Sequence, residues 1–317
     1  MRKYTLLLSA LLMVSFSALA QIKLVVCQEG GVRSEFIATS VDSIIFVGIE
    51  ETPDEPVKPD DTDKPDEEKP DTPVLPLEGS FVAKPFSVSA TKTVTFSPGN
   101  LQYHAVNDEW RFAPNQTDYI GEANENISST YNGWIDLFGW GTGNNPTNKS
   151  TDYDDYSTFV DWGVNRIGSY SPNTWRTLRY DEWYYLRWER PNYDKLIGIA
   201  EVNGVNGLIL LPDAWQCPSG LTFKAGFVND WCTECYGNYQ TISALDWSKL
   251  EASGAVFFPA AGRRYGSYVY DVQSGGYCWS ATEGNSYDAY GLYFGSGGAG
   301  MYGDGRDGGL SVRLVQD

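Results

Sequence analysis

A proline-rich acidic stretch divides the chain into two parts. Residues 50–78 hold seven prolines, twelve acidic residues and three lysines, which gives the segment a net charge of −9. Such a segment buries too little apolar surface to offset the entropy lost on ordering. Proline and charge repulsion extend it, to about 90 Å at roughly 3.1 Å per residue. We therefore expect an acidic linker at residues 49–78, acting either as a stalk or as an inert tether.

The first twenty residues have the pattern of a signal peptide. Arg2 and Lys3 form a basic start, residues 6–16 are mostly apolar, and Ala18-Leu19-Ala20 is an A-x-A cleavage site. The apolar run is shorter than the roughly 20 residues that span a bilayer. Gln21, and not cysteine, follows the cleavage site, so no lipid anchor is indicated. We expect residues 1–20 to be removed and the protein to be exported to the periplasm, cell surface or extracellular space, with no membrane span.

A small β element is expected at residues 21–48. Two short apolar runs, residues 22–26 and 43–47, flank a turn at Gly30-Gly31. Two strands alone are marginally stable in water. We therefore expect this element to dock on the main domain or to pair with another chain as an assembly partner.

Charge and histidine content exclude several function classes. The chain has 41 acidic and 23 basic residues, a net charge of −18, which repels nucleic acid. His104 is the one histidine of the sequence, so zinc sites that need several histidines are excluded. A Ser-His-Asp triad would depend on that single ring. We expect no nucleic-acid partner, no metal and no cofactor.

Residues 79–317 have the pattern of an α+β domain with long loops. Short apolar runs bounded by Gly, Asn, Pro and Ser predict many irregular strands. They lie at residues 93–96, 101–103, 110–112, 207–211, 255–258, 277–279, 290–294 and 310–315. Two short helices are expected, at residues 181–189 and 243–253. The second has Ser243 and Asp246 as an N-terminal cap pattern and Gly254 as its C-terminal stop.

Several motifs of this domain resemble exported domains that are abundant in Bacteroidetes. They are FSPGNLQY at 96–103, WRFA at 110–113, WRTL at 175–178, EWYYL at 182–186, GLILLP at 207–212 and WSKLEASGAVFFPAAG at 247–262. The ending, GYCWSATE at 276–283 and SVRLV at 311–315, is similar to the C-terminus of the Fibrobacter succinogenes major paralogous domain family. The resemblance implies a C-type lectin-like or sulfatase-modifying-factor-like fold over residues 80–317. It implies no particular activity, because one scaffold hosts many functions.

Four cysteines of this domain are disulfide candidates in an exported chain: Cys217, Cys232, Cys235 and Cys278. Four cysteines allow three pairings, and one or two disulfides are expected. A four-thiolate zinc site built on Cys232-Thr-Glu-Cys235 is an alternative, and free buried thiols are another.

A tyrosine-rich segment near the C-terminus indicates a recognition surface. Residues 265–309 contain eight tyrosines, thirteen glycines and five serines. Tyrosine supplies amphipathic contact area at low entropy cost, while Gly and Ser supply adaptable loops. The resemblance to C-type lectin-like proteins diversified by retroelements then implies these ligand-binding residues: Tyr290, Tyr293, Met301, Tyr302, Asp304 and Arg306. Alternatively, these residues suit irregular strands and alternate with core positions.

Three functions stay open at this point. The favoured one is a non-enzymatic, adhesin-like binding module for a glycan or a protein. A structural subunit of a surface assembly is the second. A carbohydrate-active enzyme is the third, with Asp181, Glu182, Glu189 and Asp213 as available carboxylates.

Overall fold

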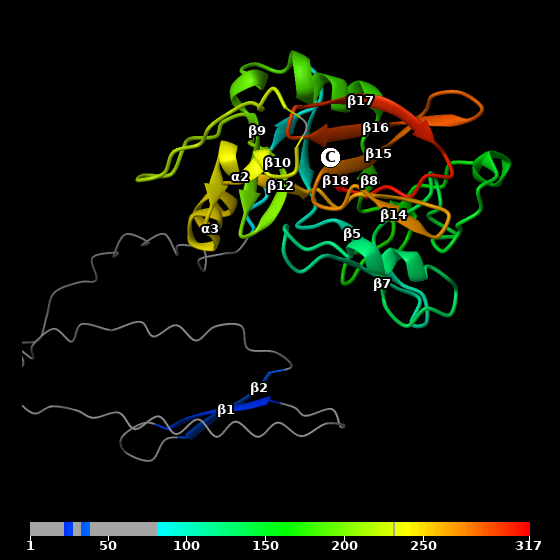
Figure 1. Ribbon diagram of the computed structural model, residues 1–317, viewed down its shortest axis with the longest axis horizontal. Helices are drawn as coiled ribbons and strands as arrows, with labels where there is room; N and C mark the ends of the chain where they lie inside the picture. The colour runs from blue at the N-terminus through cyan, green and yellow to red at the C-terminus, as the bar shows by residue number, and fades with distance from the viewer. Residues whose placement is uncertain (1–21, 28–32, 39–80, 231) are drawn as a thin grey trace, which may run out of the picture. The chain divides into compact units, whose positions relative to one another are not determined.

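The computed structural model describes residues 22–27, 33–38, 81–230 and 232–317. The chain divides into two compact units, Met1–Pro70 and Asp71–Asp317 (Figure 1). The expected signal peptide, residues 1–20, and the expected linker, residues 49–78, lie outside the described residues. In the second unit strands predominate and helices are short, so the expectation of a mixed helix-and-sheet domain is confirmed.

The first unit contains an antiparallel hairpin. Strand β1 (Ile22–Cys27) pairs with β2 (Arg33–Ala38), with Ile22 opposite Ala38 and Cys27 opposite Arg33. The expected strand at residues 22–26 is therefore confirmed. Its partner, however, comes from a segment that the sequence pattern did not indicate, and the expected strand at 43–47 lies outside the described residues.

A four-stranded sheet forms one side of the second unit, in the order β11-β9-β10-β12. Its strands are β9 (Ile197–Val202), β10 (Val205–Leu210), β11 (Thr241–Ile242) and β12 (Val256–Pro259). Alternation along β10 and β12 sends Leu208 and Phe258 into one buried cluster and Ile209 and Phe257 into another. Both faces are covered, which explains why these strands read as continuous apolar runs.

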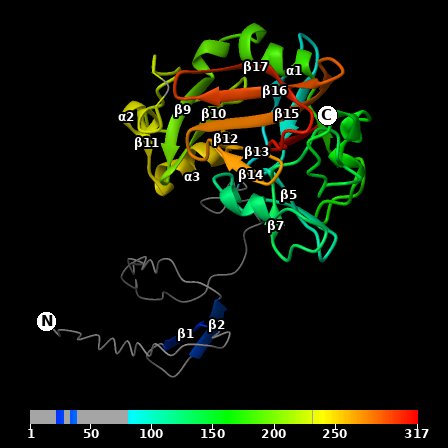
Figure 2. The same cartoon turned by 45° about the vertical axis from the view of Figure 1, so that its right-hand side comes forward.

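A three-stranded antiparallel sheet, in the order β15-β16-β17, separates the cluster that holds Leu208 and Phe258 from a third part of the core. Its strands, β15 (Gly275–Glu283), β16 (Asp288–Gly295) and β17 (Gly298–Gly305), run side by side in both Figure 1 and Figure 2. Cys278 and Leu292 are paired and pack into one buried cluster. Tyr277 and Trp279 point to the opposite face and pack into a second cluster. Neither face of this sheet is wholly open to solvent.

Smaller sheets join the two ends of the second unit. Val315 of the last strand pairs with Phe96 on one side and Arg176 on the other. The orders are β3-β4-β18-β8 and β6-β5-β7, and β13 and β14 form a separate hairpin. These strands are β3 (Phe86–Ser87), β4 (Thr93–Phe96), β5 (Leu101–His104), β6 (Glu109–Phe112), β7 (Trp134–Ile135), β8 (Arg176–Thr177), β13 (Arg263–Tyr265), β14 (Tyr268–Tyr270) and β18 (Leu314–Gln316).

Both expected helices are present. Helix α1 (Tyr180–Tyr184) continues into a π-helical turn, Tyr185–Glu189, and buries Trp183 and Leu186. Helix α3 (Ala244–Ala252) is capped by the Ser243 side chain, which accepts from the Asp246 N–H, and it ends before Gly254 at φ +96°. The pattern did not indicate α2 (Cys235–Tyr239) or four 3₁₀ turns. These turns are Gly121–Asn126, Tyr153–Tyr156, Trp162–Val164 and Tyr193–Lys195.

Candidate functional site

The six residues expected to bind ligand do not form one surface. Alternation along β16 and β17 places Tyr290 and Met301 on one face of the sheet and Tyr293, Tyr302 and Asp304 on the other. Met301 packs against the cluster that contains Leu292. The set is therefore divided by the sheet itself.

Tyr290 and Arg306 belong to structural contacts. The Tyr290 ring lies 4.5 Å from that of Tyr180, which precedes the buried part of α1. Arg306 is 3% exposed, and its guanidinium lies 5.0 Å from the Trp140 ring. The same guanidinium pairs with Glu283 and donates to the Asn285 carbonyl. A side chain held in this way supports the fold and has little surface left for a ligand.

The other face carries a chain of tyrosine rings. Tyr277 and Tyr293 have ring centroids 5.0 Å apart, and Tyr293 and Tyr302 have centroids 5.9 Å apart. These spacings lie within the range of favourable aromatic pairs. Tyr293 and Tyr302 are partly buried against the cluster that holds Trp279. The three rings therefore form a rigid aromatic layer on this face of the sheet.

Arg263 lies at the centre of this face. Its Nε is 3.2 Å from Asp271 Oδ2, and its Nη1 is 3.8 Å from Asp304 Oδ2. Nη1 also donates to the Tyr302 hydroxyl at 3.4 Å, and the guanidinium lies 5.1 Å from the Tyr277 ring centroid. The Tyr277 hydroxyl in turn donates to Asp271 Oδ2 at 2.7 Å. Arg263 is therefore held by two carboxylates and two tyrosines.

A cavity of about 290 Å³ opens beside Arg263, and we call it the tyrosine cavity. It is lined by Arg263, Arg264, Tyr265, Tyr270, Asp304 and Gly308. Tyr265 is 48% exposed and Tyr270 is 49% exposed. The volume is at the lower end of the roughly 300–1,000 Å³ typical of small-molecule pockets. The cavity is suited to one small ligand or to one end of a larger ligand.

The β13–β14 hairpin presents these tyrosines because of its turn and its alternation. Arg263 pairs with Tyr270, and Tyr265 pairs with Tyr268, so all four lie on one face. Arg264, on the opposite face, is buried and donates to the Gly266 carbonyl at 2.6 Å. In Figure 2 the hairpin lies next to β15. One face is thus anchored while the other stays exposed.

A glycine sets the entry to the hairpin. Gly262 has φ +77°, and a Cβ there would lie 2.2 Å from the Tyr270 carbonyl oxygen. No other residue type fits such a close approach without moving the backbone. The sequence motif at 247–262 therefore ends at the glycine where the chain enters the β13–β14 hairpin.

The titrating groups of the site are shifted by burial and by each other. Burial raises the pKa of Asp304, although the Tyr302 hydroxyl and Arg263 favour its charged form. Burial and the Asp304 carboxylate raise the pKa of Tyr302. Burial acts to lower the pKa of Arg263, but Tyr277 and Asp304 hold it above its usual value. The Arg263 guanidinium stays charged and Tyr302 stays protonated.

The charges in and around the cavity nearly balance. Of the lining residues, Arg263 and Arg264 contribute +2 and Asp304 contributes −1 when ionised, and the neighbouring Asp271 and Asp307 add up to −2. Burial raises the pKa of Asp307, which reduces the negative charge. The Arg263 guanidinium is already paired with Asp271 and Asp304, which favours a neutral ligand over an anionic one.

Two of the four carboxylates considered for hydrolysis hold the fold together. Both Glu182 oxygens accept from Arg176, each at 2.7 Å. Asp213 accepts from the Ser87 hydroxyl at 2.5 Å and from the buried Arg190 at 3.3 Å. Asp181 is exposed beside Arg179, and Glu189 is exposed at the end of the π-helical turn.

The four cysteines of residues 81–230 and 232–317 separate into one pair and two free thiols. Cys232 and Cys235 form a disulfide. Cys217 is exposed, with its Sγ 3.4 Å from the Leu221 carbonyl. Cys278 is buried in β15, and burial raises its pKa to about 12. A four-thiolate zinc site that unites all four is therefore wrong, because Cys217 and Cys278 do not join the pair.

Sequence reasoning found the tyrosine-rich segment and missed the residues at its opening. It did not name Arg263, Tyr265 or Tyr270 among the ligand-binding residues. The pattern R-x-Y-G-S-Y-x-Y at 263–270 would have revealed them, because Gly-Ser between two alternating runs indicates a hairpin with one tyrosine face.

No protein-family model matches this chain, no curated protein matches it, and no solved structure matches it. Within residues 22–27, 33–38, 81–230 and 232–317, no helix is long and apolar enough to cross a membrane. The described features define a mixed helix-and-sheet protein with a small aromatic cavity centred on Arg263.

Proposed function

We propose that this chain is an exported, non-enzymatic recognition module that binds a neutral glycan in the tyrosine cavity. The observation that carries the proposal is the arrangement of two half-exposed tyrosines, Tyr265 and Tyr270, around the Arg263–Asp304 pair. We further propose that the fold is C-type lectin-like, on the strength of the sequence resemblance, and that the module acts as an adhesin.

The chemistry of the cavity matches that of a sugar. A pyranose presents apolar C–H faces and a rim of hydroxyl groups that donate and accept hydrogen bonds. Tyrosine rings offer flat apolar area for the faces and hydroxyls for the rim. The Arg263 guanidinium donates, and the Asp304 carboxylate accepts. Few ligand classes use both kinds of contact within one small cavity.

The Arg263 side chain is held before any ligand arrives. It is fixed by Asp271 and Asp304 and by the Tyr277 ring, which itself packs on Tyr293. Preorganised groups lose little freedom on binding, which improves affinity for a small contact area. This feature supports recognition without a conformational change.

The positions of the carboxylates support the non-enzymatic part of the proposal. Glu182 and Asp213 are engaged with Arg176 and Arg190. Asp304 and Asp271 both pair with Arg263. A glycosidase needs one carboxyl group that keeps its proton and one that stays charged on opposite sides of a bond. Two carboxylates that clamp one guanidinium have a different role.

A glycan array probed with the full chain tests the proposal. We expect hits among neutral glycans that persist when calcium is replaced by a chelator. A Tyr265→Ala/Tyr270→Ala variant should lose them. Tyr268→Ala is the matched control, because Tyr268 lies on the same hairpin, is 67% exposed and does not line the cavity. An array without hits, or hits that the double variant retains, would overturn the proposal.

A second function, assembly through the N-terminal hairpin, is supported by the pairing of β1 with β2. A two-stranded sheet has two free edges and is marginal alone. We propose that residues 21–48 pair with a neighbouring chain. Oligomers that form with rising concentration and vanish when residues 21–48 are deleted would support this role, and a monomer at all concentrations would refute it.

A further inference from the structure

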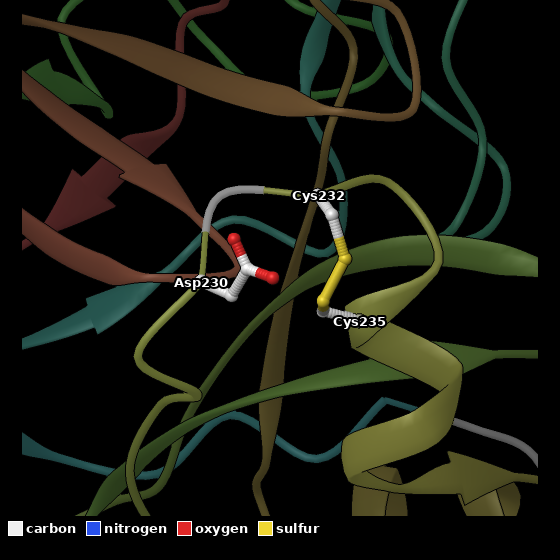
Figure 3. Close-up of side chains that lie close together, drawn as sticks. All are labelled: Asp230, Cys232 and Cys235. Atoms are coloured by element: carbon white, nitrogen blue, oxygen red, sulfur yellow. A yellow bond between two sulfur atoms is a disulfide. The ribbon is translucent and has the colours of Figure 1, made fainter.

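The Cys232–Cys235 pair lies beside a carboxylate that the proposed function does not use. One Asp230 oxygen and both sulfurs lie within 4.8 Å of one another. In Figure 3 the Asp230 carboxylate points toward the disulfide, and Cys235 lies at the start of α2. Both cysteines are partly exposed and Asp230 is exposed, so solvent reaches the cluster.

The segment is held in place by bonds that do not involve sulfur. The Cys232 N–H donates to the Ser296 hydroxyl at 2.9 Å, and that hydroxyl donates to the Asp230 carbonyl at 2.5 Å. Asn206 of β10 donates to the Thr233 carbonyl at 3.1 Å. Breaking the sulfur–sulfur bond would therefore leave the Asp230 and Cys232 backbone tied to the turn between β16 and β17.

The far end of the segment is anchored as well. Tyr236 follows Cys235 directly, is fully buried, and donates to the Ser274 carbonyl at 3.1 Å. The Cys235 N–H donates to the Cys232 carbonyl at 3.3 Å. The two cysteines thus stay close together when they are reduced, which gives a preformed dithiol site.

A disulfide between residues three apart contributes little by closing its loop. The entropy that a cross-link removes from the unfolded chain grows with the logarithm of loop length, so this loop is near the minimum of the effect. The C-x-x-C spacing is instead that of metal knuckles and of exchangeable dithiols. With the disulfide broken, two thiolates and one carboxylate would face a common point.

We propose that Asp230, Cys232 and Cys235 form a redox-gated site for a divalent transition metal, for which zinc is well suited. Zinc takes four ligands in a tetrahedron and accepts both thiolate and carboxylate. Three protein ligands leave one position for water or for another ligand. The disulfide closes the site, because sulfurs bonded to each other are not thiolates and do not bind zinc.

A dithiol reductant opens the site by thiol–disulfide exchange. One thiolate of the reductant attacks a cysteine sulfur, and the other cysteine leaves as a thiolate. The second reductant thiol then attacks the mixed disulfide and releases the first cysteine. The reductant becomes a cyclic disulfide and supplies two electrons and two protons. Metal binding releases the two thiol protons to solvent.

Cobalt(II) is the probe for the test, because thiolate ligands give it an intense charge-transfer band. The full chain is reduced with a phosphine, freed of reductant without oxygen, and titrated with cobalt. We expect one cobalt per chain with a thiolate band that zinc abolishes. The oxidised chain and the Cys232→Ser variant should show no such band. Cys217→Ser should behave as the reduced wild type, since Cys217 is outside the cluster.

A matched pair of variants tests the carboxylate. Asp230→Asn should weaken cobalt binding at least about tenfold while keeping the thiolate band. Glu234→Gln also removes one negative charge, but from an exposed residue that lies between the two cysteines in sequence and outside the cluster. It should change the cobalt affinity less than about threefold. Equal effects of the two variants would refute Asp230 as a ligand. A reduced wild type without the band would overturn the proposal, even if Cys232→Ser fails to fold.

Discussion

Two hairpins of this protein each carry three tyrosines and have opposite surroundings. The β16–β17 hairpin is covered on one face by the cluster around Leu292 and on the other by the cluster around Trp279. The β13–β14 hairpin buries Arg264 on one face and exposes Tyr265 and Tyr270 on the other. Composition thus indicates the type of surface that a segment can form. Coverage by neighbouring elements decides whether that surface is available.

The largest expected effect is a loss of stability on replacing Arg306, which follows β17. Replacing Arg306 with Ala removes a buried guanidinium and leaves the Asn285 carbonyl without its donor. We expect the free energy of unfolding to fall by about 2–4 kcal/mol. Urea unfolding followed by fluorescence measures this. If Arg306→Ala keeps its stability and loses glycan binding, the site lies at β17 and not at β13–β14.

Arg263→Gln should have the reverse effects, a small loss of stability and a large loss of glycan affinity. The Arg263 side chain is 41% exposed and its ion pairs are near the surface, so the stability loss should stay within about 1 kcal/mol. Glycan affinity should fall at least about tenfold, which is roughly 1.4 kcal/mol. Titration calorimetry and urea unfolding of the same preparation separate the two effects. A stability loss equal to that of Arg306→Ala would place Arg263 in the core instead.

Acidification should weaken binding through Asp304. An aspartate normally loses its proton near pH 4, and burial raises the pKa of Asp304, so its charged form appears only at higher pH. The ion pair with Arg263 and the affinity should therefore rise with pH in a window above about 4. Asp304→Asn should bind weakly with no such rise. A parallel pH dependence in wild type and variant would contradict this role.

The raised pKa of Asp304 makes folding stability depend on pH in the direction opposite to binding. Because the folded-state pKa of Asp304 is raised above the unfolded value, its contribution to stability is present below about pH 4 and is lost as the pH rises through the folded-state pKa. Binding and stability should therefore respond to this carboxyl group in opposite directions. Thermal unfolding of wild type and Asp304→Asn across the same pH range makes the comparison.

The smallest expected effect is that of Tyr268→Ala. Tyr268 is the most exposed tyrosine of the β13–β14 hairpin and does not line the cavity. Both the free energy of unfolding, within about 0.5 kcal/mol, and the glycan affinity should stay close to wild type. A large loss of affinity would extend the binding surface beyond the tyrosine cavity.

Local signals made part of the fold predictable from sequence. Ser243 and Gly254 mark the ends of α3 because a cap and a left-handed stop act within a few residues. The apolar run predicted at 207–211 overlaps strand β10 (Val205–Leu210), both of whose faces are buried. Strand β17 was not predictable in this way. It contains glycines at 298, 300, 303 and 305, and its conformation comes from pairing with β16.

The site was less predictable because it depends on contacts between distant segments. Arg306 is a charged residue in a polar loop, which in sequence terms indicates exposure, yet Glu283 and Trp140 enclose it. The pairing of Cys232 with Cys235 was one of several open arrangements, and only the fold separates Cys278 from them. Sequence indicated the kind of chemistry, and tertiary contacts selected the residues.

The most direct test of the central claim is a calorimetric titration of the strongest neutral glycan against four forms of the full chain. These are the wild type, Tyr265→Ala/Tyr270→Ala, Tyr268→Ala, and Tyr290→Ala from the opposite face of the sheet. We predict a loss of affinity of at least about tenfold in the double variant and wild-type affinity in the other two variants. Equal affinity in all four forms, or a loss confined to Tyr290→Ala, would contradict the account.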